Sequence, residues 1–206
     1  MILASHVIFS AYGFWLPNDP RGSWSDFVGA WELFRYGRAT KTTETCSLAA
    51  RPHDGERRLA AKEALKFPPV KFTGIQARAV ARGFATYAGK SGLIIHACAI
   101  LPDHVHLVLA RHRLDVEKLV IQLKGHATQH LLEENLHPFS RDAQRSADER
   151  LPKCFARGEW KVFLKSEDDI LRAVRYVEGN PHKEGLPIQR WQFVTAYGSR
   201  SAARRG

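Results

Sequence analysis

Two apolar segments joined by a tight turn constrain the fold of this 206-residue chain more than any other feature. Leu93–Leu101 is a nearly unbroken apolar run, and an apolar, β-branched pattern resumes after Pro102 and Asp103 and continues to Leu109. Such a pair predicts a β-hairpin. A helical pattern over residues 73–89 precedes it. A hairpin after a helix, in place of strict strand–helix alternation, excludes a doubly wound parallel sheet.

The remaining periodicity places other elements on both sides of the hairpin. They are a first strand at His6–Trp15, a helix that starts at Asp115, a strand at Glu159–Lys165 and a last helix with Ser166 as N-cap that ends near Asn180-Pro181. This order predicts an α+β fold, a ferredoxin-like β-α-β-β-α-β core with an insertion after the first strand and a C-terminal helix that bears Tyr176. We interpret residues 1–206 as one domain, with the insertion at about 18–72 and a tail at about 185–206.

A pair of histidines stands at the start of the second hairpin strand. His104 and His106 are two residues apart, so their side chains project from the same face of the strand. Two neighbouring imidazoles on a rigid strand can ligate one metal ion. Two partly buried histidines that hydrogen-bond locally fit the same spacing. The spacing alone leaves both interpretations open.

The last helix carries a tyrosine away from its apolar face. At about 100° per residue, Tyr176 points roughly 150° from the centre of that face, and Asn180 follows one turn later on the same side. A phenol with a pKa near 10 attacks a phosphodiester only when a metal and nearby cations assist it. The Asn180 amide oxygen could complete a metal site begun by the histidines. As an asparagine before proline, it could equally cap the helix.

The charge balance favours a polyanionic partner. Lysine and arginine number 31 against 21 aspartate and glutamate residues, a net charge of +10, which favours nucleic acid before membrane, although a basic and inert surface fits too. Aromatic residues that could stack on unpaired bases, or simply pack in the core, are Trp15, Trp24 and Trp191.

The sequence contains no feature that directs it to a membrane or an oxidising compartment. No apolar run reaches the length of about 18 residues that a membrane span needs, and the apolar start fits a strand better than a signal peptide. The cysteines are odd in number and far apart, which argues against a disulfide framework or a cysteine zinc site and fits a reducing compartment (Cys46, Cys98 and Cys154). We therefore expect a cytoplasmic protein.

Three stretches resemble one family in the right order. The segment L-P-D-H-V-H-L-V-L (101–109) resembles the His-hydrophobic-His (HUH) motif of single-tyrosine transposases. The segment R-Y-V-E-G-N-P-H-K-E-G-L-P (175–187) resembles the tyrosine helix of their REP-associated and insertion-sequence branch. The segment F-S-A-Y-G-F-W-L-P-N-D-P-R-G-S (9–23) is similar to a stretch found in a subset of that family. Roughly residues 25–70 and 135–150 are unmatched.

The resemblance implies a metal-dependent transposase, a single-strand DNA endonuclease and strand transferase that binds a DNA hairpin beside its cleavage point. It implies that His104 and His106 hold Mg²⁺ or Mn²⁺, that Asn180 supplies a third metal contact where relatives often carry glutamine, and that Tyr176 is the nucleophile of a 5′-phosphotyrosine intermediate. The family commonly works as homodimers. A replication-initiation HUH nickase shares this chemistry, and the Y-V-E-G-N-P segment favours the transposase branch.

A rival from another class is a non-catalytic, domesticated module on the same fold that binds single-stranded nucleic acid. It would retain the basic charge without needing both histidines and the tyrosine. All three are present, which favours the enzyme.

Overall fold

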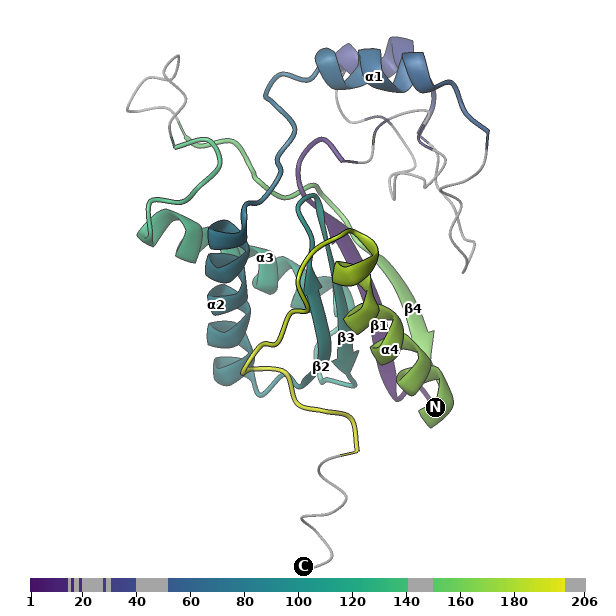
Figure 1. Cartoon of the computed structure of the whole chain (residues 1–206), viewed down its shortest axis with the longest axis vertical. Coiled ribbons are helices and arrows are strands. Elements are labelled where there is room, and N and C mark those ends of the chain that lie inside the picture. The colour runs from purple at the N-terminus through teal and green to yellow at the C-terminus, as the bar shows by residue number, and fades with distance from the viewer. Residues whose placement is uncertain are drawn as a thin grey trace, which may run out of the picture.

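Four antiparallel strands form the central layer of the computed structural model, which describes residues 1–14, 16, 19, 28, 31–39, 52–140 and 150–198. The strands lie side by side in the order β2-β3-β1-β4 (Figure 1), and their bounds are Ala4–Ser10 (β1), Ile95–Ile100 (β2), His104–Ala110 (β3) and Trp160–Leu164 (β4). The chain order β1-α2-β2-β3-α3-β4 combined with this sheet order is the ferredoxin-like arrangement. The predicted α+β fold class is confirmed.

Helices cover both faces of the sheet. On one face α2 (Gly74–Ser91) and α3 (Val116–Glu133) pack against the larger apolar core, which includes Val7 and Phe9 of β1 and Leu107 of β3. On the other face lies α4 (Glu167–Lys183), over a smaller core (Figure 1) that comprises Ala4, Ala97, Ala99, Val108, Leu164, Ile170, Ala173 and Val177. Alternation along β1 and β3 sends their histidines (His6, His104 and His106) to this second face.

Local signals fix the ends of α2. The Thr73 hydroxyl accepts from the backbone of Gln76 and the Gln76 side chain accepts from the backbone of Thr73, which forms a capping box. The helix continues past Gly89, the expected terminator, and ends at Gly92, which adopts φ +72 and caps it in the left-handed region. Its contact with α3 is close, because a Cβ added at Gly83 would lie 2.5 Å from the Ala127 backbone.

The segment between β1 and α2 contains a short 3-10 helix, η1 (Trp31–Tyr36), and α1 (Gly55–Glu63). The two contact each other and share a small apolar cluster of their own, which includes Leu33 and Ala61. The first strand, expected to reach Trp15, ends at Ser10. The division into core, insertion and tail stays a prediction, and Trp15, Trp24 and Cys46 lie outside the residues that the structure describes.

None of the helices in the described ranges combines the length and the apolarity that a membrane crossing requires.

Candidate active site

The histidine pair lies at the start of β3, on the face that α4 covers. His106 pairs with Ile8 of β1 and with Ala99 of β2, so it occupies the middle of the sheet and is only 4% exposed. His104 pairs with Ser10 at the strand end. The two rings lie 4.8 Å apart between centroids. Hydrogen bonds of the ladder on both sides of β3 hold the pair rigidly.

The tyrosine is placed by the packing of α4. A capping box between Ser166 and Asp169 starts this helix, and its apolar residues Ile170 and Val177 are buried against the sheet. Tyr176 then stands at the margin of the packed face, 44% exposed, with its ring centroid 5.7 Å from that of His106. Tyrosine and histidine therefore meet within one chain.

Asn180 lies inside α4 and does not cap it. The helix runs on to Lys183 through Pro181, and Glu184 is its C-cap, which corrects the expected end at Asn180-Pro181 and excludes the capping interpretation. The Asn180 side chain is buried at 6% exposure. Its Nδ2 atom has no hydrogen-bond partner among the residues that the structure describes. Such an amide costs stability unless a ligand satisfies it.

His6 of β1 belongs to this cluster, and sequence reasoning did not select it. Its Nε2 lies 3.2 Å from Nδ1 of His106, and the two nearly parallel rings have their centroids 5.5 Å apart. Its ring is also 5.7 Å from that of Tyr176. The one available signal was a histidine at an alternate position of an apolar strand, but only the β1–β3 register shows which residue it meets.

His104 has partners of its own. Its Nδ1 lies 2.7 Å from the Asp103 carboxylate, and Phe14 stacks on the ring with centroids 4.9 Å apart. A carboxylate on one ring nitrogen selects the tautomer that leaves the other nitrogen, Nε2, with a free lone pair. Asp103, expected only to form the hairpin turn, thus also orients a histidine.

A lysine from the end of α4 lies over the tyrosine ring. Lys183 follows Tyr176 by two helical turns, and its Nζ lies 4.6 Å from the ring centroid. The sequence offered a signal for it in the spacing of seven residues, which returns to the same side of a helix. A positive charge here stabilises a phenolate or a phosphate oxygen.

Burial shifts the ionisation of the site. Desolvation lowers the pKa of His6 to about 4, and desolvation and then the neighbouring His104, His6 and Lys183 hold the pKa of His106 well below 6.5. Both imidazoles are therefore neutral near pH 7, which is the form that binds metals. Burial raises the pKa of the Tyr176 phenol, and the nearby Asn180 amide, whose Nδ2 makes no hydrogen bond of regular geometry, partly opposes that rise. The tyrosine consequently needs assistance to ionise.

The donor types of the three residues named from the sequence suit one divalent cation with open positions. Within the described ranges, no three histidine, cysteine or acidic side chains are grouped as metal ligands, so His6 does not join the pair as a third such donor. His104 and His106 offer imidazole nitrogens, and Asn180, whose buried Nδ2 is unsatisfied, carries an amide oxygen as a further donor. Mixed nitrogen and oxygen donors suit Mn²⁺, and Mg²⁺ when several waters remain bound.

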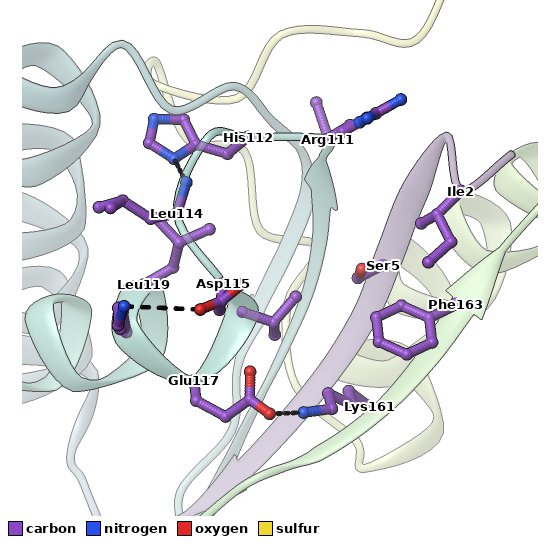
Figure 2. Close-up of a pocket in the computed structure, with 13 residues that line it drawn as sticks. Ile2, Ser5, Arg111, His112, Leu114, Asp115, Glu117, Leu119, Lys161 and Phe163 are labelled. Atoms are coloured by element: carbon purple, nitrogen blue, oxygen red, sulfur yellow. Dashed lines mark hydrogen bonds and ion pairs between the residues drawn. The ribbon is translucent and has the colours of Figure 1, made fainter.

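A separate hollow of about 450 Å³ lies on the opposite face of the sheet, beside the start of α3 (Figure 2). Ser5 and Phe163 form part of its lining, and Lys161 is paired there with Glu117. None of the candidate site residues lines it. The tail residue Trp191 packs on Phe193 against the larger core, which favours the core interpretation of that tryptophan.

The site therefore consists of a histidine pair on a ferredoxin-like sheet and a tyrosine on the helix that covers the same face of that sheet. No protein-family model and no curated protein matches the chain. Similar solved structures include a REP-associated tyrosine transposase bound to a REP hairpin, with a TM-score of 0.48 and 12% identity over 100% of this chain and 82% of that chain. Another is a Deinococcus radiodurans protein provisionally assigned as a transposase, with a TM-score of 0.37 and 14% identity over 87% of this chain and 91% of that chain.

The first of these two proteins is a member of the class that the sequence motifs resemble.

Proposed function

We propose that this protein is a metal-dependent transposase that cleaves and rejoins single-stranded DNA through a tyrosine nucleophile. The observation that carries the proposal is the position of Tyr176, 5.7 Å from His106 between ring centroids and in the same chain. A tyrosine that served only to pack its helix would have no need of a position beside the buried His106. The alternative, a non-catalytic binding module, does not account for this meeting.

The reaction exchanges one phosphodiester for another. The Tyr176 oxygen forms a bond to phosphorus, the bond between phosphorus and the 3′ oxygen breaks, and the phenol's proton ends on the released 3′ hydroxyl. The product is a 5′-phosphotyrosine that a second 3′ hydroxyl can attack in the reverse sense. Because each step conserves one phosphodiester bond, strand transfer requires no nucleotide cofactor.

Each residue of the site has a role in this scheme. His104, His106 and Asn180 would hold a Mg²⁺ or Mn²⁺ ion, which supplies Lewis-acid polarisation of the phosphate oxygens. Lys183 lowers the cost of negative charge on the Tyr176 oxygen. Tyr176 lies beside His106 of its own chain, so the proposed chemistry does not require a second chain to supply the nucleophile.

The substrate proposed is a DNA hairpin with a single-stranded cleavage site. It follows from the motif resemblance, and the net charge of +10 supports a polyanion of this kind. Sequence-independent phosphate contacts would supply most of the affinity, so binding should weaken steeply with salt. An enzyme of this type would meet its DNA in the cytoplasm.

The test is a search for a covalent adduct. Hairpin oligonucleotides with 3′-terminal label are incubated with the full chain and Mn²⁺, and the products are resolved in SDS. We expect a protein-linked labelled strand, and from 5′-labelled DNA a free fragment whose 3′ end a polymerase extends. The Tyr176→Phe variant should form no adduct, whereas Tyr197→Phe, which alters a tail tyrosine, should react like the wild type.

The variants His104→Ala and His106→Ala should bind hairpins but lose metal-dependent cleavage, since phosphate contacts lie elsewhere. Hairpin binding without any adduct over a broad hairpin library would refute the enzyme and favour the binding module. An adduct that survives Tyr176→Phe would refute the choice of nucleophile.

A further inference from the structure

His6 occupies a position that the proposed chemistry does not explain. It is 8% exposed, in the middle of β1, and its ring is fixed from two sides. The Nδ1 edge of His106 faces its Nε2 edge with the two ring planes inclined by only 21°, and Trp160 of β4 meets it edge to face at 90°. An imidazole with such packing holds a defined orientation. It is a costly residue to bury unless its nitrogens are used.

The contact with His106 uses particular atoms. Nε2 of His6 lies 3.2 Å from Nδ1 of His106, which is hydrogen-bond distance for two ring nitrogens of which one donates and the other accepts. The two residues are diagonal neighbours across the β1–β3 ladder, since His6 is opposite Val108 and His106 is opposite Ile8. The backbone ladder therefore sets their separation.

In both His104 and His106 the Nδ1 atom of the ring has a hydrogen-bonding partner. Nδ1 of His104 is held by the Asp103 carboxylate at 2.7 Å, and Nδ1 of His106 is held by His6 at 3.2 Å. In each ring this leaves Nε2 for another partner. Metal-binding histidines commonly have their second nitrogen fixed in this way, and the fixed nitrogen decides which tautomer and orientation the ring adopts.

We propose that His6 is a positioning residue that accepts a hydrogen bond from Nδ1–H of His106 and so presents Nε2 of His106 to the metal. This rests on the proposed function, because it assumes that His106 is a metal ligand. A direct ligand role for His6 is disfavoured, because no three such side chains in the described ranges are grouped around one point. The opposite direction of donation would place the proton of His106 on Nε2 and block the metal.

Two measurements on the full chain without DNA test the proposal. Long-range ¹H–¹⁵N NMR of the metal-free protein, at about pH 8 where imidazoles are neutral, reports the tautomer of each histidine. We expect His106 to carry its proton on Nδ1. Calorimetric titration with Mn²⁺ then gives the affinity of the site. His6→Phe retains a ring but cannot accept, and we expect it to weaken Mn²⁺ binding roughly 10–100-fold.

The matched variant is His6→Gln, whose side-chain oxygen can take the place of Nε2 as acceptor. It should recover Mn²⁺ affinity to within about threefold of the wild type and restore the Nδ1–H tautomer. A role that is only structural would not distinguish the two variants in this order. Circular dichroism and unfolding midpoints of both variants establish that the compared proteins are folded.

Three results would overturn the proposal: a wild-type His106 protonated on Nε2, unchanged Mn²⁺ affinity in His6→Phe, or a direct metal-induced shift of the His6 nitrogens on titration with Mg²⁺. The outcomes separate it from the proposed function. Wild-type protein that binds Mn²⁺ with the expected tautomer but forms no DNA adduct refutes the transposase and leaves the role of His6 standing. Wild-type protein that binds no Mn²⁺ refutes both.

Discussion

Replacing the buried amide of Asn180 with alanine should stabilise the metal-free protein and abolish its reaction with DNA. Nδ2 of Asn180 is buried without a hydrogen-bond partner in the described ranges, and such a donor costs about 1–3 kcal/mol. Alanine also has the higher helix propensity, by up to about 0.7 kcal/mol. The packing lost with the amide offsets part of this gain. We expect the free energy of unfolding to rise by about 1 kcal/mol, which raises the melting temperature by roughly 2–4 °C.

A second amide provides the matched control. Oε1 of Gln189 accepts from the Ile100 backbone N–H at 2.8 Å and its Nε2 donates to the Ile100 carbonyl at 2.8 Å, so both ends are satisfied. Gln189→Ala should therefore lose about 1 kcal/mol or more. Urea unfolding of both variants in chelator gives the stabilities, and the adduct assay gives the reaction. Loss of stability in Asn180→Ala, or a normal adduct yield, would refute the assignment of this amide to metal binding.

Three further perturbations test other parts of the structure. Acidification should destabilise the metal-free protein, because burial lowers the pKa of His6 from 6.5 to about 4, and between these values the unfolded chain binds a proton that the folded chain does not. The free energy of unfolding should fall by about 3 kcal/mol as the pH is lowered from 6.5 to about 4. Urea midpoints that fall as steeply in the His6→Phe variant as in the wild type would contradict this. Gly83→Ala should lower the free energy of unfolding by about 1–3 kcal/mol in thermal unfolding, since its Cβ would lie 2.5 Å from the Ala127 backbone. Gly89→Ala on the same helix meets open space and should raise the free energy of unfolding by about 1 kcal/mol. Equal effects of the two substitutions would refute the close contact between α2 and α3. Lys183→Met should slow single-turnover adduct formation roughly tenfold while Lys183→Arg retains most of it, and an unchanged rate in Lys183→Met would exclude a role for this charge.

Much of the fold was predictable because its signals are local. The turn at Pro102 and Asp103, the N-cap of α4 at Ser166 and the helical stripe of α3 each depend on residues within a few positions of one another. The errors fell at boundaries. The last helix runs through Pro181 because its buried face continues there, a packing effect that overrides the local preference of proline.

In the candidate site, too, the features set by local sequence were predictable and those set by tertiary packing were not. Alternation along one strand placed His104 and His106 on one face, and helical geometry turned Tyr176 and Asn180 to one side, so the sequence by itself determined both halves. Whether the halves face each other was a matter for the tertiary structure, which brings Tyr176 to His106 through the packing of α4 on the sheet.

The tertiary structure also decided what surrounds them. His6 meets His106 across 100 positions of sequence, through a strand register that no local pattern encodes. The same is true of the buried and unsatisfied state of Asn180, which depends on the sheet beneath it. Backbone periodicity acts within one element and is legible in the sequence, whereas the identity of a neighbour depends on how elements pair and pack, which is fixed only when the whole chain has folded.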